Sequence, residues 1–137
     1  MDDAVARYRT ASEANDIDGL METLADDAEL VSPISGRMVF RGKADLRVLL
    51  TAVYGSITGL RWREQVGDGT VHVAVADGKV GPLKLGDAMV FELAGDGRIR
   101  RIRPHLRPWL ALTVLAIKLG PRLGRHPGLI GRALRRP

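Results

Sequence analysis

The sequence predicts one α+β domain in which three helices come first and a curved antiparallel sheet then wraps around them. Two observations carry this prediction. In the first half of the 137 residues, apolar side chains recur every three or four positions, as on the buried side of a helix. From about residue 60 the period changes to two, and glycine-containing turns separate the apolar runs, which is typical of antiparallel strands. Helices followed by hairpin-connected strands describe a cone-shaped fold, and the chain length suits a single domain.

The first helix is predicted over residues 2–14. The second helix begins after Asn15 or Asp16, because either side chain can accept a hydrogen bond from the first free backbone N–H groups. Its apolar stripe consists of Ile17, Leu20, Met21 and Leu24. The third helix is predicted from Lys43 to Tyr54, and its stripe has the same spacing: Leu46, Leu49, Leu50 and Val53.

Short strands with tight turns account for most of the remaining chain. Before the third helix, a turn at Asp26-Asp27 leads into a strand over residues 29–32, which Pro33 ends. After that helix, strands are predicted over residues 60–66, 70–76, 83–93 and 98–106. The turns between them fall at Gly67-Asp68-Gly69, Asp77-Gly78 and Ala94–Gly97. The predicted domain therefore covers residues 1–107.

Residues 108–137 are predicted to form an extra helical tail. Residues 109–119 are almost wholly apolar, Gly120-Pro121 breaks the helix, and a second short helix starts near Pro127. The first of these helices is at most about 18 Å long, too short to cross a hydrocarbon core of about 30 Å. The tail could cover the mouth of a pocket, pack in a dimer, or lie on a membrane surface. We favour the first two roles because an interfacial helix should keep a wide polar face.

The charge of the chain is distributed unevenly. Residues 98–137 carry 11 Lys and Arg and no Asp or Glu, whereas residues 1–97 have a net charge of −6. This asymmetry indicates an anionic partner for the tail, namely a membrane surface, nucleic acid or the acidic body of a neighbouring subunit. A solvated surface is the alternative. Nucleic acid fits poorly, because Trp109 is the only aromatic residue that could stack on a base in this region.

The residues that several kinds of functional site require are absent from this sequence. It has no Cys, so it has neither disulfides nor zinc-thiolate sites. Its three His are scattered without metal-ligand spacing, and no glycine-rich phosphate loop is present, so we expect no metal or cofactor. The acidic start lacks the apolar segment of a signal peptide. We therefore expect a cytoplasmic protein, with association to a membrane surface through residues 108–137 as an alternative.

Asp87 is the main candidate for chemistry on physical grounds. It lies in phase with the apolar residues of its strand, which are Leu83, Leu85, Met89 and Phe91. An isolated buried carboxylate is costly, and burial raises its pKa. The neutral acid can then donate a hydrogen bond to a substrate oxygen. The structural alternative is an aspartate that pairs with an arginine or caps a bulge.

Three segments near the N-terminus resemble one known family: Arg7-Tyr8, Asn15-Asp16-Ile17-Asp18-Gly19-Leu20, and Leu24-Ala25-Asp26-Asp27-Ala28-Glu29-Leu30-Val31-Ser32-Pro33. The chain is similar here to the ketosteroid isomerases, within the nuclear-transport-factor-2-like (SnoaL-like) superfamily. In those enzymes the run reads R-Y, then N-A-G-D-L-D-G-I, then A-D-D-A-T-V-E-D-P. The resemblance covers about residues 4–104 and implies the same cone-shaped fold.

The resemblance also implies roles for three residues. Tyr8 and Asp87 match the oxyanion-hole tyrosine and the protonated aspartate that hydrogen-bond the substrate oxygen. Ser32 stands where the family has the aspartate that moves a proton between two carbons of the steroid. A serine hydroxyl is no general base without a base beside it. Glu64 and His72 are candidates to replace it if they point inward, and structural roles are the alternative for both.

These residues lead us to expect a pocket for a small, mostly apolar compound that carries a carbonyl or phenolic oxygen, such as a steroid- or polyketide-like molecule. We expect the following residues to contact it: Trp62, Glu64, His72, Met89 and Phe91. Whether the protein is an isomerase or cyclase acting through enolate stabilisation, or a non-catalytic binding module, stays open. The superfamily resemblance further implies a homodimer.

Overall fold

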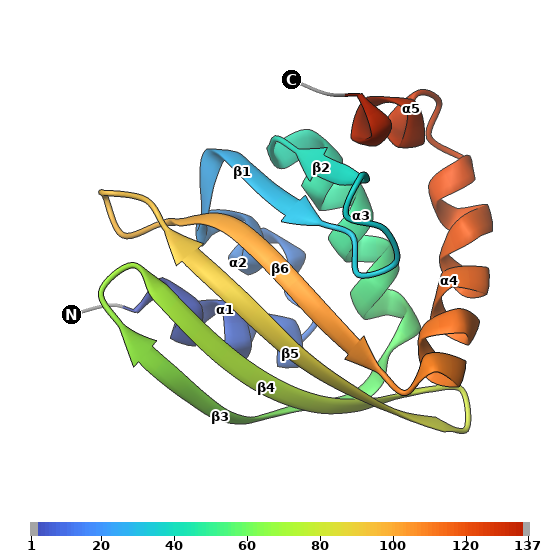
Figure 1. Cartoon of the computed structure of the whole chain (residues 1–137), viewed down its shortest axis with the longest axis horizontal. Coiled ribbons are helices and arrows are strands. Elements are labelled where there is room, and N and C mark those ends of the chain that lie inside the picture. The colour runs from blue at the N-terminus through green and yellow to red at the C-terminus, as the bar shows by residue number, and fades with distance from the viewer. Residues whose placement is uncertain (1–2, 136–137) are drawn as a thin grey trace.

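The computed structural model describes residues 3–135, and residue 2 of the predicted first helix lies outside this range. The helices are α1 (Ala4–Glu13), α2 (Ile17–Glu22), α3 (Lys43–Ser56), α4 (Trp109–Gly124) and α5 (Leu129–Leu134). The strands are β1 (Leu24–Val31), β2 (Val39–Arg41), β3 (Thr58–Asp68), β4 (Val71–Val80), β5 (Leu83–Leu93) and β6 (Ile99–Arg107). Figure 1 shows the strands as one long, twisted sheet.

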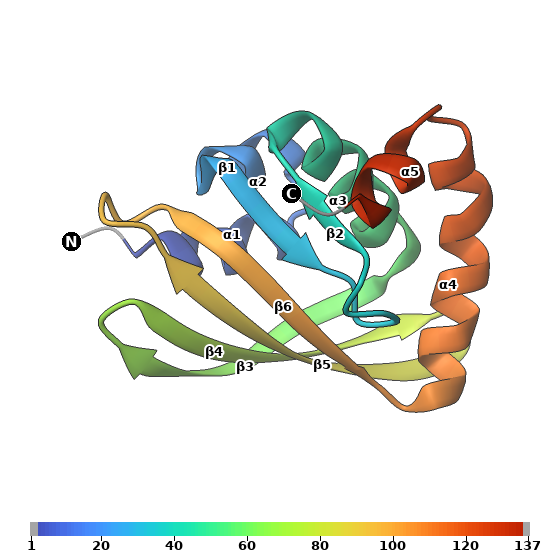
Figure 2. The ribbon, with the colours of Figure 1, turned by 45° about the horizontal axis from the view of Figure 1, so that its top comes forward.

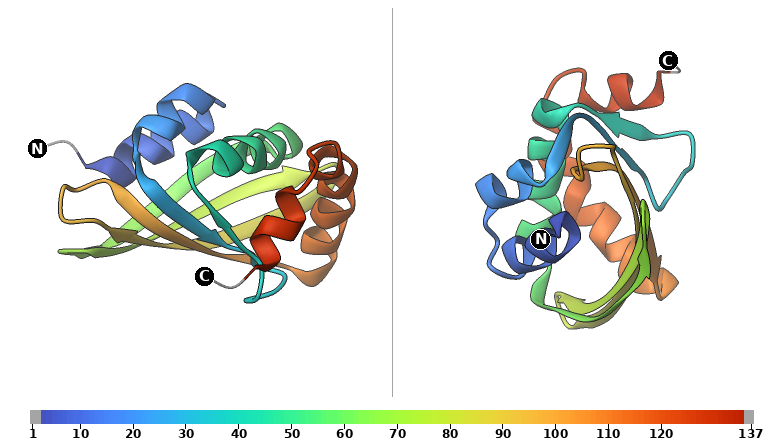
Figure 3. Two further views of the ribbon diagram at one scale, coloured as in Figure 1. Left: turned by 90° about the horizontal axis from the view of Figure 1, so that it is seen from above. Right: turned by 90° about the vertical axis from the view of Figure 1, so that its left-hand side faces the viewer.

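The six strands form a single sheet in the order β2-β1-β6-β5-β4-β3. Neighbouring strands pair antiparallel, except that β1 and β6 run parallel. Helices α1 to α3 lie on one side of the curved sheet, and α4 stands across the end of the sheet far from the N-terminus (Figure 3). The predicted α+β cone is therefore confirmed.

The main core fills the space between the concave side of the sheet and the first three helices. Val5, Leu20, Leu46 and Ile102 are among its fully buried members. The predicted cap of the second helix is Asp16, whose side chain accepts a hydrogen bond from the backbone N–H of Gly19 at 3.0 Å at the start of α2. A second cluster joins α4 to the end of the β4–β5 hairpin, and its buried residues are Val80, Leu85, Ala111 and Leu115.

Strand β1 begins five residues before the predicted strand and contains the predicted turn at Asp26-Asp27. The prediction of a turn is wrong: the chain stays extended through Asp26 and Asp27, both of which are exposed, and the irregularity appears as a shift in the pairing with β6 between Leu24 and Glu29. Asp26 also forms exposed ion pairs with Lys43 at 3.7 Å and Arg98 at 3.5 Å.

The turn predicted at Asp77-Gly78 is also absent, because β4 continues to Val80. The chain reverses instead near Gly81, whose φ of +57° is left-handed and favours glycine. Gly78 has a different role. A Cβ atom there would lie 2.8 Å from Cγ2 of Ile57, so glycine lets the chain after α3 approach β4 closely.

Helix α4 continues through Gly120-Pro121, where the sequence predicted a break. Contacts beyond the proline explain why the helix does not end. Leu123 is buried in the main core, and the Arg122 guanidinium donates hydrogen bonds to Ser56 Oγ at 3.0 Å and Ala52 O at 3.4 Å. These contacts hold the last turns of α4 against α3 (Figure 2). Among the described residues, no helix combines the length and the apolar character needed to cross a membrane.

Candidate functional site

A cavity of about 260 Å³ lies between α3, the concave face of the sheet and α4. Its walls are mainly aliphatic. Helix α3 contributes Leu49 and Val53, and α4 contributes Leu112, Leu115 and Leu119. The lining residues with polar side chains are Ser32, Tyr54, Asp77 and Asp87. Ser32 directly follows β1, whereas Tyr54 comes from α3 and Asp87 from β5.

Asp87 lies on the inner face of β5, where its register partners are Ala76 on β4 and Leu106 on β6. Its Oδ1 atom is buried and has no hydrogen-bond partner among the described residues. Burial raises the pKa of Asp87 to about 7, although the backbone N–H of His105 acts in the opposite direction. The side chain is thus available as a donor when protonated and as a proton acceptor when ionised.

Two tyrosines lie beside this carboxyl group. The hydroxyl oxygens of Tyr8 and Tyr54 are 2.8 Å apart and form a buried hydrogen bond. Burial raises the pKa of both tyrosines well above the usual value, and the charge of Asp87 raises them further. Tyr54 lines the cavity, whereas Tyr8 lies behind it in the core. Both hydroxyl groups therefore stay protonated at neutral pH and can act as hydrogen-bond donors.

Tyr54 was not singled out in the sequence, although one signal was present. It lies four residues after Leu50 and so continues the apolar stripe of α3 by one helical turn. A tyrosine on a buried stripe needs a partner for its hydroxyl group. Only the tertiary structure, in which the Tyr54 hydroxyl of α3 meets the Tyr8 hydroxyl of α1, identifies that partner.

Of the five residues predicted to contact a ligand, Met89 lines the cavity. Trp62 and Phe91 instead pack around Tyr8, with ring centroids 6.5 Å and 5.2 Å from its ring. The Trp62 indole N–H donates a hydrogen bond to Ser12 Oγ at 2.8 Å. These two aromatic residues therefore contact the Tyr8 ring and do not line the cavity.

The expectation that Glu64 points inward is wrong. The pairing of β3 with β4 shifts between Trp62 and Glu64, which places one extra residue in β3 and reverses the alternation. Glu64 is exposed in consequence. Gln65 turns inward instead and hydrogen-bonds with Arg9 and Asp3, each at 3.0 Å.

His72 is on the inner face but lies far from Asp87. It pairs in register with Phe91, four residues along β5 from Asp87, which corresponds to about 13 Å. Its Nε2 atom lies 3.3 Å from Gly69 O in the β3–β4 turn. Neither Glu64 nor His72 therefore reaches the cavity as a replacement base.

Ser32, for which the resemblance implies the position of a catalytic aspartate, lines the cavity and is 8% exposed. Its Oγ atom accepts a hydrogen bond from the backbone N–H of Ile34 at 3.2 Å. Asp77 lies at the cavity edge, but its carboxylate pairs with Arg63 at 2.9 Å and is 57% exposed. Within residues 3–135, Asp87 is therefore the one cavity-lining carboxyl group outside an ion pair.

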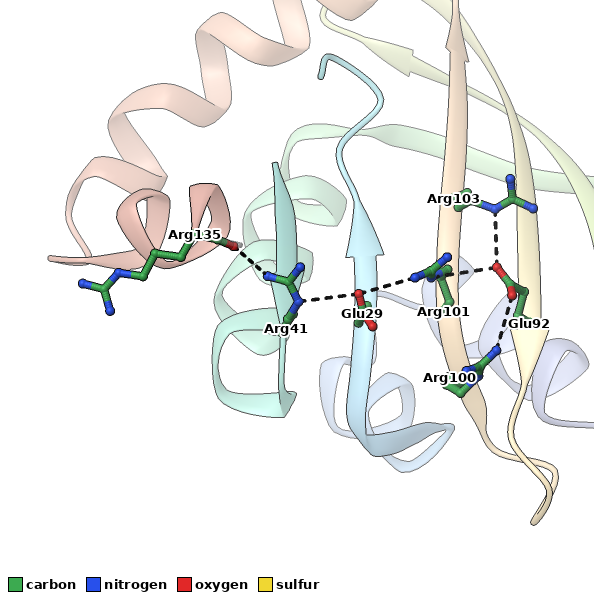
Figure 4. Close-up of polar contacts among 7 residues, drawn as sticks. All are labelled: Glu29, Arg41, Glu92, Arg100, Arg101, Arg103 and Arg135. Carbon is green, nitrogen blue, oxygen red and sulfur yellow. Dashed lines mark hydrogen bonds and ion pairs between the residues drawn. The ribbon is translucent and has the colours of Figure 1, made fainter. Parts of the chain in front are cut away.

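A second set of charged residues lies on the opposite face of the sheet (Figure 4). Arg101 lies between Glu29 at 3.8 Å and Glu92 at 3.9 Å, and thereby connects β1, β6 and β5. Arg41 extends the set from Glu29 to the backbone oxygen of Arg135. Both carboxylates are paired with more than one arginine, so this cluster stabilises the sheet rather than moving protons. No group of three or more His, Asp or Glu within the described part is placed to hold a metal ion.

The SnoaL-like domain model matches residues 5–102 of this chain. No curated protein matches the sequence. Among solved structures, a bacterial protein with a cystatin-like fold from Silicibacter pomeroyi matches with a TM-score of 0.87 and 20% identity, over 95% of this chain and 93% of that one. A steroid delta-isomerase from Pseudomonas aeruginosa matches with a TM-score of 0.81 and 24% identity, over 90% of each chain.

An epoxide hydrolase/cyclase-like enzyme of salinomycin pyran-ring formation matches with a TM-score of 0.66 and 18% identity, over 79% of this chain and 90% of that one. At these identities the matches establish the fold alone. Residues 1–107 cannot by themselves account for 95% of the chain, so the match to the Silicibacter protein extends into the helical tail. Helix α4 is thus a part of this fold that other proteins share.

Proposed function

This chain belongs to the SnoaL-like domain family, and we propose that it binds a small, mostly apolar compound through a carbonyl or phenolic oxygen. The compound would occupy the cavity under α4. The protonated Asp87 and the hydroxyl group of Tyr54 would donate hydrogen bonds to its oxygen, and Tyr8 would orient Tyr54. Aromatic polyketide-like and steroid-like compounds have the required combination of an apolar body and one such oxygen.

One observation carries this proposal: the buried Oδ1 of Asp87, which has no hydrogen-bond partner among the described residues, lies in a mainly aliphatic cavity. A buried polar atom without a partner costs about 1–3 kcal/mol. A ligand oxygen at this position would recover that free energy. An apolar ligand body would meanwhile be buried against the aliphatic walls, at about 25 cal/mol per Å².

The volume of the cavity limits the size of the ligand that can bind while α4 stays in its present position. A cavity of about 150 Å³ holds benzene, and typical ligand sites measure about 300–1,000 Å³. At about 260 Å³, the cavity suits a compound with two fused rings. A four-ring steroid would fit only after an outward movement of α4, whose side chains form one wall.

Proton transfer by Asp87 itself is the second candidate function. It is favoured by the absence of any other unpaired carboxyl or imidazole group among the described lining residues. A group with a pKa of about 7 is well suited to take up and return a proton at neutral pH. In that case Asp87 would remove a proton next to the ligand carbonyl and return it to another carbon. The tyrosine pair would stabilise the enolate oxygen meanwhile.

Titration with a fluorescent phenolic steroid or naphthol tests the proposal. Binding should be tight at pH 6 and weaken above pH 7, because the ionised Asp87 repels the electron-rich oxygen instead of donating to it. Asp87→Asn keeps an N–H donor, so it should bind with a reduced dependence on pH. Asp87→Leu should bind at least tenfold more weakly, and the exposed Asp68→Asn serves as the control. No binding by the wild-type protein at either pH would contradict the proposal.

The two candidate functions give opposite results in an isomerisation assay. Catalysis by Asp87 as a base requires a rate that rises with pH through about 7 and is abolished in Asp87→Asn. If the pocket only binds its ligand, neither the wild-type protein nor Asp87→Asn should show turnover. A 5-ene-3-ketosteroid and a smaller unsaturated ketone should both be assayed, since the smaller one fits without movement of α4.

A further inference from the structure

The outer face of α4 is apolar although no other described part of the chain covers it. Trp109, Leu110 and Ile117 are 76%, 50% and 68% exposed. Successive residues of a helix are rotated by about 100°, so Leu110, Ile117 and Pro121 share one face, with Trp109 at its edge. The opposite face is buried through Ala111, Leu115 and Leu123. Helix α4 therefore presents apolar residues both to the protein and to its surroundings.

Basic residues flank this exposed apolar face. Lys118 on α4 and Arg125, the residue that caps its C-terminal end, are exposed at one side of it. Near the N-terminus of α4, a groove beside Pro108 is lined by Arg63, Lys79, Lys84 and Arg107. The groove contains one carboxylate, Asp77, which is already paired with Arg63. From residue 98 to the end, the sequence has 11 basic and no acidic residues.

We propose that the outer face of α4 docks on an anionic lipid membrane. The exposed apolar side chains would enter the boundary between headgroups and acyl chains, while the flanking cations would contact lipid phosphates. Tryptophan is enriched at this depth of a bilayer, and Trp109 is exposed at the edge of the apolar face. With 16 residues, α4 is about 24 Å long, which suits a helix that lies in the membrane plane.

A second copy of the chain fits this face less well. A two-fold dimer through α4 would bring identical cationic surfaces together without a single carboxylate from residues 98–137. The sequence-based objection that an interfacial helix needs a wide polar face does not apply here. The inner side of α4 is covered by the protein itself, so only its outer side has to match the membrane.

The docked orientation has a consequence for the cavity. Since the inner side of α4 lines the cavity, the docked helix would stand between the bilayer and the ligand, and an outward shift would open the cavity toward the lipid. This consequence rests on the proposed function, whereas the docking itself does not. A vesicle experiment without ligand therefore tests the docking alone.

The full-length protein would be floated with vesicles of phosphatidylcholine, or of phosphatidylcholine and phosphatidylglycerol in equal parts. We expect recovery with the anionic vesicles only, a decrease with added salt, and a blue shift of Trp109 emission. Lys118→Gln with Arg125→Gln should weaken partitioning about 25-fold, because each cation near an anionic surface contributes about fivefold. Leu110→Ser with Ile117→Ser should weaken it as well.

The matched control is Val66→Ser with Val71→Ser. These two valines are 60% and 47% exposed at the β3–β4 hairpin, at the end of the sheet opposite α4 (Figure 1). The control should float as the wild type does. Failure of the wild type to bind anionic vesicles would overturn the proposal, and so would equal binding by the α4 variants. Conversion of a dimer to a monomer by the α4 substitutions would assign the face to a second copy instead.

Discussion

The hydroxyl oxygens of Tyr8 and Tyr54 lie 2.8 Å apart in the protein interior, although the residues are 46 positions apart in the chain. Each hydroxyl group is the partner that keeps the other from being buried without a hydrogen bond. Tyr8→Phe and Tyr54→Phe should therefore each lower the free energy of unfolding by about 1–2 kcal/mol. The double variant should lose less than the sum, since its remaining rings leave no orphaned hydroxyl group. Denaturant unfolding measures this, and strict additivity would contradict the pairing.

The same two substitutions should differ in their effect on ligand binding. Tyr54 lines the cavity and Tyr8 does not. Tyr54→Phe should therefore weaken binding of a phenolic ligand about tenfold, the effect expected for loss of one good hydrogen bond. Tyr8→Phe should weaken ligand binding less, because this substitution only removes the hydrogen bond that orients the Tyr54 hydroxyl group. A fluorescence titration would show the opposite order if Tyr8 were the direct donor.

The raised pKa of Asp87 predicts how stability changes with pH. In the folded protein the pKa of Asp87 is about 7, above the usual 3.8, so the unfolded chain loses this proton first as the pH rises. As the pH rises from about 4 to about 7, this group should lower the free energy of unfolding by up to about 1.4 kcal/mol per pH unit.

Asp87→Asn should remove that contribution and stabilise the protein most at or above pH 7. Thermal or urea unfolding at several pH values between 4 and 8 measures the difference between the two proteins. The exposed Asp68→Asn variant is the control and should follow the wild-type profile. Parallel profiles for wild type and Asp87→Asn would mean that the carboxyl group is ionised in the folded protein throughout.

Ser32→Asp should create isomerase activity on an unsaturated ketone. The substitution places an aspartate where the resemblance to the ketosteroid isomerases implies the base, at a position that lines the cavity. Local structure favours it, because a carboxylate oxygen can accept the same bond from the Ile34 N–H that Ser32 Oγ accepts now. Ser32→Asn is the matched control, with the same shape and no base. Equal rates for Asp and Asn at this position would show that a base here does not reach the substrate.

Two arginines of the tail form hydrogen bonds with α3. We predict that removing these bonds changes the access of a ligand to the cavity. Arg122 bonds to the C-terminal end of α3, and Arg132 forms a two-bond contact with Asp45 at 2.8 and 2.9 Å near its start. Arg122→Ala should increase amide hydrogen exchange in α4 several-fold, and Asp45→Asn should do so in α5. Both should speed ligand association. A conservative Arg132→Lys change should have a smaller effect, since it keeps the charge but not the paired geometry.

The sequence by itself predicted the α+β cone, the three N-terminal helices and the inward position of Asp87. Each of these predictions depends on the spacing of apolar residues within one segment, which can be seen in the sequence itself. The phase of the strand with Leu85, Asp87 and Met89 was readable because that strand has no irregularity between those residues. The phase of Glu64 was misjudged because a bulge in β3 leaves no clear mark in the sequence.

Only the tertiary structure decided which residues share the cavity. The hydroxyl group of Tyr54 on α3 meets that of Tyr8 on α1 from 46 positions away. Ser32 directly follows β1, which is placed by its parallel pairing with β6. The course of α4 through Pro121 was likewise set by long-range contacts of Leu123 and Arg122, which outweigh the local preference for a break. Periodicity determines which face of an element is buried, whereas the identity of its partners depends on packing between segments far apart in the chain.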